Sequence, residues 1–188
     1  MTKFADVQKE IEGILPNSPL DFDLGHARLV LKWVLKLKPN ADEALRIAAL
    51  SHDIDRAITG ITEKDLKDYS KINEFKKEHS LRSAKFICDI LVKHKYPQSI
   101  IEKVKHLVEL HEFGGDDEAD ILRDADSIAY FEYNIPGYLK RNGKERTIGK
   151  IQFMYNRLSE KAKKMVRDMR YKDPEVAKLV KESISKKL

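Results

Sequence analysis

The sequence lacks the marks of several large protein classes. Its single cysteine, Cys88, excludes an intramolecular disulfide framework and favours a reducing environment. No segment approaches the roughly 18 uninterrupted apolar residues of a membrane span, so we expect no membrane partner. The first residues, MTKFADVQKEIEG, lack the basic start and apolar segment of a secretory signal. These absences predict a soluble, cytoplasmic protein.

Two phosphate-binding motifs are also missing. The chain contains neither GxxxxGK[ST] nor GxGxxG, which argues against a P-loop NTPase and a dinucleotide-binding Rossmann domain. Alternation of apolar and polar residues, the mark of strands, is not convincing anywhere. We therefore expect an all-α fold.

The composition describes a globular chain of one domain. The 188 residues are 41% hydrophobic and 36% charged, enough apolar surface for a sizeable core. The net charge of +5 suits anionic partners, but 36 basic and 31 acidic residues are interspersed, which describes a mixed surface better than a DNA-binding stripe. Apolar residues at helical spacing predict helices at about 3–13, 21–37, 42–56, 63–70, 74–94, 98–112, 117–133, 148–170 and 174–186.

Several histidines fall on the apolar faces of these predicted helices. At 100° per residue, His26 shares a face with Val30 and Trp33, and His52 shares one with Leu45 and Ala48. The same rule turns two more inward: His79 lies with Phe75, Ser83, Phe86 and Ile90, and His111 lies with Ile100, Val104, Leu107 and Val108. We expect four buried histidines on four helices.

Two aspartates accompany these histidines. Asp126 shares its face with Leu122 and Ala129, whereas Asp124 projects from another face. Asp53 follows His52 directly and lies at the edge of its helix face, or beyond a distorted helix end. An unsatisfied buried polar group costs about 1–3 kcal/mol, so a shared partner is the economical explanation for so many. Imidazoles and carboxylates without thiolate suit a divalent metal such as Mn, Fe, Co, Ni, Zn or Mg.

The order of these residues resembles the HD-domain superfamily of metal-dependent phosphohydrolases. The family's usual AALLHD appears as AALSHD at 48–53, and its distal DADxL appears as DADSI at 124–128. The resemblance covers roughly residues 20–135 and implies an HD-like helical bundle, with 136–188 as a helical extension of a single domain, 1–188. It departs from the family where Ile54 stands in place of a glycine and where Glu78 precedes His79 instead of a second histidine.

The resemblance also implies roles for the residues. His26, His52, Asp53 and Asp126 would hold one metal, and His79 and His111, with Asp53 shared, would hold a second, so that one or two ions bind. Asp53, His79 and His111 would form the catalytic group around a metal-activated water. Because histidine ligands must be neutral, activity is expected to fall below about pH 6.

Basic residues are candidates for contacts with an anionic substrate, for which we expect a nucleotide or related small phosphate ester. Arg56 follows the His-Asp pair and Arg82 follows His79, although solvation or pairing with Asp55 and Glu78 is the competing interpretation. The predicted loop YLKRNGKERTIGK gathers further cations around Gly143, of which Lys140 and Arg141 are the first, unless this run is only a solvated face.

Two other functions remain open from the sequence. Some HD proteins with two irons use oxygen instead of water, and two extra histidines do not exclude such an oxygenase. A catalytically inactive, metal-stabilised regulatory or nucleic-acid-binding module is the non-enzymatic alternative, which the basic charge favours. The aromatic stretch IAYFEYNIPGY could also cover an interface with a second copy of the chain.

Overall fold

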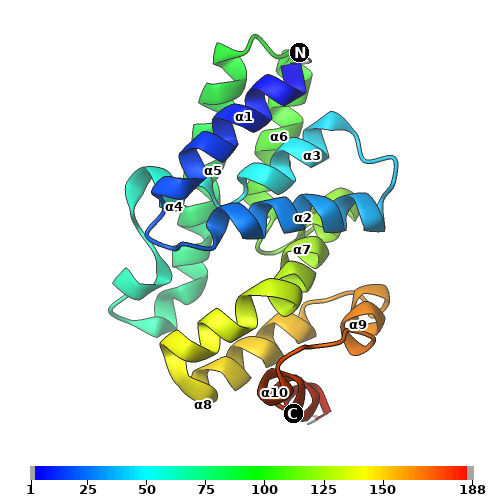
Figure 1. Ribbon diagram of the computed structural model, residues 1–188. Coiled ribbons are helices and arrows are strands. Elements are labelled where there is room, and N and C mark those ends of the chain that lie inside the picture. The colour runs from blue at the N-terminus through cyan, green and yellow to red at the C-terminus, as the bar shows by residue number, and fades with distance from the viewer. Residues whose placement is uncertain (1–2, 186–188) are drawn as a thin grey trace. The chain divides into compact units, whose positions relative to one another are not determined.

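The structure, a computed structural model, describes residues 3–185 and is helical wherever these residues form regular secondary structure (Figure 1). This confirms the all-α prediction; residue 186 of the predicted last helix lies outside the described residues. The elements are α1 (Lys3–Ile14), α2 (Asp23–Leu37), α3 (Glu43–Ser51), α4 (Ile54–Thr59), α5 (Ile72–Lys93), α6 (Gln98–Leu110), α7 (Asp117–Ala129), α8 (Ile135–Asn156), α9 (Glu160–Arg167) and α10 (Pro174–Ser185).

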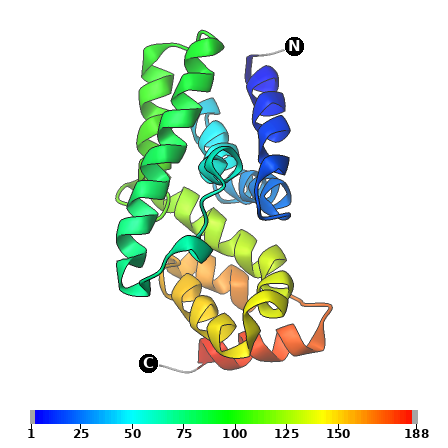
Figure 2. The ribbon, with the colours of Figure 1, turned by 90° about the vertical axis from the view of Figure 1, so that its left-hand side faces the viewer.

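The chain divides into two compact units, residues 1–123 and 124–188, with α7 running from the first into the second. In the first unit α3 packs against α1, α2 and α6, and α5 lies beside α6, as Figure 2 also shows. In the second unit α8 packs against α10 and against the π-helical segment Tyr130–Asn134 (η4). The single domain with an extension from residue 136 stays a prediction.

Helix α3 is a central element of the first unit because its side chains are small. Ala44, Ala48 and Ala49 have no exposed surface, which lets three neighbouring helices approach this one closely. Asp42 caps its first turn by accepting a hydrogen bond from the backbone nitrogen of Leu45. Close packing at the end of this helix fixes the position of the residues that follow it.

We expect Ala48→Leu to destabilise the metal-free protein by about 1–3 kcal/mol, because added methylenes have no space in a close-packed core. Urea denaturation followed by circular dichroism measures the change. Ala5→Leu, at a half-buried position of α1, is the matched control. Equal stability of the two variants would contradict close packing around α3.

Two predicted helices and one predicted loop outside the region of the histidines differ from the structure. Residues 63–70 form two 3₁₀ turns, Glu63–Asp65 and Tyr69–Lys71, because Thr62 and Asp65 close a capping box around a single tight turn. The predicted helix 148–170 is interrupted, since Ser159 caps a new helix, α9, by accepting from the backbone nitrogen of Ala162. The predicted loop around Gly143 is shorter than expected, since α8 is helical on both sides of a kink at Gly143, which has φ 75° and ψ 173°.

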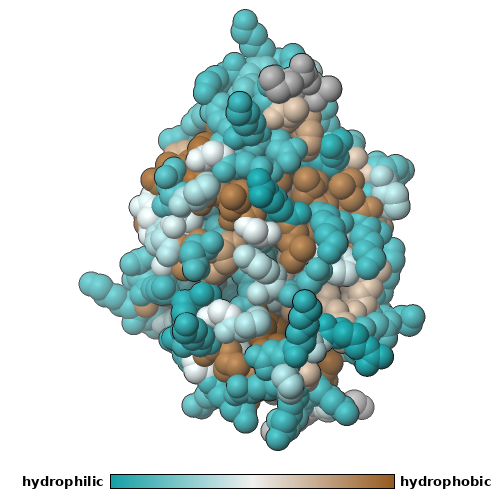
Figure 3. All heavy atoms as spheres, in the orientation of Figure 1, coloured by the Kyte–Doolittle hydropathy of each residue, from teal (hydrophilic) through white to brown (hydrophobic). Residues whose placement is uncertain are grey.

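Charged side chains dominate the exposed surface. The face drawn in Figure 3 is largely hydrophilic, with hydrophobic areas scattered between charged groups. No helix within residues 3–185 combines the length and the apolar character needed to span a bilayer.

Candidate metal centre

The backbone leaves the helical path at His52 and Asp53. The sequence predicts one helix over 42–56, but α3 ends at Ser51, α4 begins at Ile54, and Asp53 between them has φ −107° and ψ 13°. That prediction is therefore wrong at these two residues. Outside a regular helix, Asp53 is not held 100° away from His52, and its Oδ2 lies 3.5 Å from His52 Nε2. Both side chains are buried.

Four histidine rings surround Asp53. His26 comes from α2, His52 from the end of α3, His79 from α5 and His111 from the end of α6, and each is at most 4% exposed. The ring centroid of His52 lies 5.5 Å from that of His26 and 5.2 Å from that of His111. The ring centroids of His79 and His111 lie 5.4 Å apart. All four histidines are buried, as the face rule predicts.

These side chains form two groups with the geometry of a metal site. His26, His52 and Asp53 form the first triad, and Asp53, His79 and His111 form the second triad. Within each triad the ligand atoms all lie within 4.8 Å of one another. The buried histidines and aspartate are thus positioned to hold a metal ion, and Asp53 is common to both triads.

Hydrogen bonds orient the rings towards this centre. His52 Nδ1 donates to the carbonyl oxygen of Ala49 at 3.0 Å, and His111 Nδ1 donates to that of Val108 at 2.7 Å. Since a carbonyl oxygen only accepts, the proton of each neutral ring is on Nδ1 and the lone pair of Nε2 is left for a ligand. The set of imidazoles and one carboxylate, without thiolate, therefore fits a divalent metal.

The pKa values of the second triad are strongly shifted. Burial, together with the neighbouring His52, lowers the pKa of His111 to about 4, so this ring is neutral at pH 7. Burial also disfavours the charged form of His79, but its hydrogen bonds to Asp53 and Asp55 outweigh that effect and raise its pKa to about 9. Without metal, His79 is therefore protonated at neutral pH.

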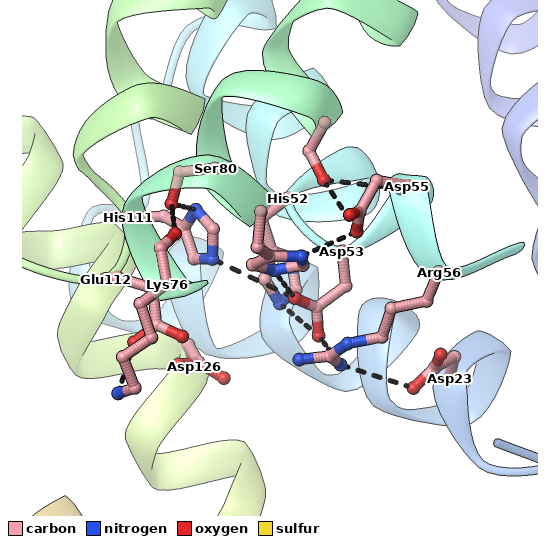
Figure 4. A network of polar contacts seen from close by, with 12 residues as sticks. Asp23, His52, Asp53, Asp55, Arg56, Lys76, Ser80, His111, Glu112 and Asp126 are labelled. Carbon is pink, nitrogen blue, oxygen red and sulfur yellow. Dashed lines mark hydrogen bonds and ion pairs between the residues drawn. The ribbon is translucent and has the colours of Figure 1, made fainter. Parts of the chain in front are cut away.

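Arg56 neutralises Asp53. Burial disfavours the charge on Asp53, but the nearby Arg56, His52 and His79 overcome this and hold the pKa of Asp53 well below its usual range. The guanidinium of Arg56 forms an ion pair with the Asp53 carboxylate, and its Nη1 lies 3.6 Å from Oδ1 of the buried Asp23 (Figure 4). Arg56 thus pairs with the carboxylates of Asp53 and Asp23, and not with Asp55 or Glu78 as the sequence suggested.

Arg82 pairs with Asp55 and Glu78, as the competing interpretation of the sequence predicts. Its Nε lies 3.1 Å from Asp55 Oδ2, and its Nη1 lies 3.8 Å from Glu78 Oε2. Asp55, completely buried, also lies 2.6 Å from His79 Nδ1. A substrate contact by Arg82 or Arg56 stays a prediction.

The remaining predicted residues belong to the second unit. Asp126 forms an ion pair with Arg157, which directly follows α8, and its part in metal binding stays a prediction. Asp124, expected to project away from the apolar face, is buried because its carboxylate accepts from the backbone nitrogen and hydroxyl of Ser159 at the start of α9. Lys140 and Arg141 are exposed on α8, and their contact with a substrate likewise stays a prediction.

The sequence did not single out three polar residues around the histidines. Asp23 precedes His26 by three residues, a spacing on one helix face that could have revealed it. Lys76 stands in the same relation to His79, and its ammonium pairs with Glu112 at 2.9 Å in a largely buried position. Asp55 gives no comparable signal, because it follows the break in the helix.

The comparisons with known proteins identify a family but no activity. A family model described as "Domain of unknown function (DUF4202)" matches residues 8–180. The chain therefore belongs to this family. No curated protein and no solved structure matches it significantly.

Proposed function

We propose that this member of the DUF4202 family is a metal-dependent phosphohydrolase that acts on a nucleotide or related small phosphate ester through a metal-activated water. One observation carries the proposal: two buried triads of histidine and carboxylate share Asp53. The resemblance of AALSHD and DADSI to HD-domain motifs supports the same reaction class.

The cost of burying these groups supports a catalytic centre over a purely structural one. Four histidines and two carboxylates, Asp53 and Asp55, lie within one small region of the first unit, each at most 6% exposed. Ionisable groups so strongly desolvated and with shifted pKa values gather preferentially at functional sites. A stabilising core would be built more simply from apolar residues of similar volume.

The protein's own residues would divide the work. His26 and His52 with Asp53 would hold one ion, His79 and His111 with the same carboxylate a second, and Asp126 is the proposed further ligand of the first. A divalent ion, when bound, supplies water of lowered pKa and positive charge for the phosphoryl oxygens. The carbonyl groups of Ala49 and Val108 keep the Nδ1 protons of His52 and His111 in place, so that Nε2 stays available.

Arg56 is the best placed of the proposed substrate contacts. Its guanidinium already adjoins Asp53, and its side chain is 15% exposed, so a phosphate beside the triads would lie within its reach. Planar guanidinium groups bind phosphate oxygens in pairs, which suits this role. Arg82, Lys140 and Arg141 are proposed as additional contacts for an anionic substrate.

The proposal is tested by metal analysis of the purified protein, followed by a panel of nucleotides and phosphate esters with Mn, Mg, Co, Ni and Fe. We expect phosphate release that depends on the added metal and stops with chelator. The control is the same protein after its metal has been removed with chelator.

The same experiment separates the two alternatives. Redox-active iron with oxygen consumption on an organic substrate would replace the hydrolase by an oxygenase. Binding of nucleic acid that weakens steeply with salt, without turnover, would identify a binding module. Either result would overturn the proposed hydrolysis.

A further inference from the structure

Three side chains of α5 contact the carboxylate of Asp55. It is fully buried, and its Oδ1 lies 2.6 Å from His79 Nδ1. Ser83 Oγ donates to the same oxygen at 3.3 Å, and Arg82 Nε donates to Oδ2 at 3.1 Å. Figure 4 shows Asp55 above Asp53. We propose that Asp55 is a positioning residue that prepares His79 for metal binding and thereby decides whether the second triad holds an ion.

The contact sets His79 apart from the other oriented histidines. His52 and His111 present Nδ1 to neutral backbone carbonyl groups of their own helices, Ala49 and Val108. His79 presents Nδ1 to a carboxylate from a different element, α4. A carboxylate acceptor holds the Nδ1 proton more firmly than a carbonyl and makes the other ring nitrogen a stronger donor to a metal.

The ring is thereby fixed between two aspartates. His79 Nε2 lies 2.8 Å from Asp53 Oδ1, while Nδ1 faces Asp55. With the Nδ1 proton held by Asp55, Nε2 is the only nitrogen that can donate electrons towards the side shared with Asp53. Asp55 thus sets both the tautomer and the direction of this ligand.

Arg82 and Ser83 keep the Asp55 carboxylate from turning away. Arg82 engages one oxygen, and the Ser83 hydroxyl engages the other, where His79 also binds. Ser83 Oγ further accepts from the Asp55 backbone nitrogen at 3.3 Å, which ties the start of α4 to α5. This arrangement explains why an acidic residue follows the His-Asp pair after one apolar residue.

The inference rests on the proposed function in one respect, that the second triad holds an ion, and not on the reaction. Asp55→Asn tests it with little change in volume. One of the two oxygens becomes an amide NH₂, which only donates, so a single oxygen is left to accept from Arg82 and His79. Because the donors compete for one oxygen, His79 loses its fixed tautomer.

We expect Asp55→Asn to weaken Mn²⁺ binding at the second triad by about 10- to 100-fold, as is typical when the partner of a ligating histidine is lost. The first triad should keep its affinity. The number of Mn²⁺ ions bound per chain at low metal concentration, measured by titration calorimetry, should therefore fall from two to one. The visible spectrum of the Co²⁺-loaded protein should lose the contribution of one ion. Asp89→Asn, the same change at an exposed position of α5 outside this network, is the matched control and should bind as wild type does.

The outcomes separate this inference from the proposed reaction. Asp55→Asn with two ions at wild-type affinity would overturn the positioning role, and so would equal losses from both triads, which would indicate general damage to the fold. A wild-type protein with no ion at the second triad would overturn it as well. A wild type that binds two ions but releases no phosphate would refute the hydrolase, while the selective loss in Asp55→Asn would still support the role of Asp55.

Discussion

Asp53→Asn is expected to remove both bound ions and to lower phosphate release at least about 1,000-fold. Asp53 is the only side chain common to the two triads, so its loss affects each of them. An amide is neutral and a poor ligand, and a metal ion contributes several kcal/mol to the stabilisation of a phosphoryl transition state, which corresponds to about three decades in rate. Metal content by mass spectrometry and phosphate release on the best substrate of the panel measure the two effects.

The control for this variant is Asp89→Asn, the same change at an exposed position of α5. It should keep both ions and full activity. Circular dichroism should show that Asp53→Asn remains helical. Retention of both ions by folded Asp53→Asn would place the metal centre elsewhere.

The affinity of the second triad for metal is expected to rise about 50-fold between pH 7 and pH 9, as the neutral fraction of His79 rises from about 1% to about half. His79 has a pKa of about 9 in the metal-free protein, and a metal must displace the proton on Nε2. Each pH unit below this pKa therefore costs about a factor of ten in affinity. His111, with its pKa near 4, and Asp53, with its depressed pKa, release no proton in this range.

Titration calorimetry with Mn²⁺ in buffers of different ionisation enthalpy gives both the affinity and the number of protons released. We expect one proton per ion at the second triad near pH 7 and none well above pH 9. The variant His79→Gln should lose this dependence together with the ion. A flat affinity between pH 7 and pH 9 would show that His79 is not the ligand that must lose a proton. This loss of metal affinity would begin at a higher pH than the value of about 6 below which ordinary histidine ligands become protonated.

The sequence allowed prediction of those histidines whose burial follows from helical periodicity. His26 and His79 lie within long helices, α2 and α5, where the spacing of apolar residues defines a face. His52 and His111 stand at the ends of their helices, and the helices leading to them, α3 and α6, point them inward. Local periodicity is sufficient where a helix packs with one face on the core, as α2, α5 and α6 do, whereas α3 is buried on nearly all sides and turns almost any position inward.

Asp53 and Asp55 could not be placed in this way. The apolar spacing over 42–56 continues across the break after Ser51, so periodicity alone predicts an unbroken helix. The conformation of Asp53 depends on its contacts with Arg56 and His79, and the role of Asp55 depends on Arg82 and Ser83, 27 and 28 residues away. Such tertiary hydrogen bonds leave no mark in the local pattern.

The second unit shows the opposite error, because the sequence predicts a long loop where helix continues up to a kink at Gly143 and resumes after it. Gly143 and the surrounding charges have the composition of a connection, yet only Gly143 departs from helical geometry within α8. Thr147 supports the return to helix by donating from its hydroxyl to the carbonyl oxygen of Gly143 at 2.7 Å. The glycine with a positive φ therefore marks the break in the helix, and composition overestimates only the length of the connection.

Anomalous diffraction from crystals grown with Mn²⁺ tests the metal centre most directly. The account predicts two anomalous peaks, one coordinated by His26, His52 and Asp53 and the other by His79, His111 and the same Asp53, with His79 Nδ1 still bonded to Asp55. Crystals that diffract well with Mn²⁺ in excess, show no peak beside Asp53 and retain its ion pair with Arg56 would contradict it.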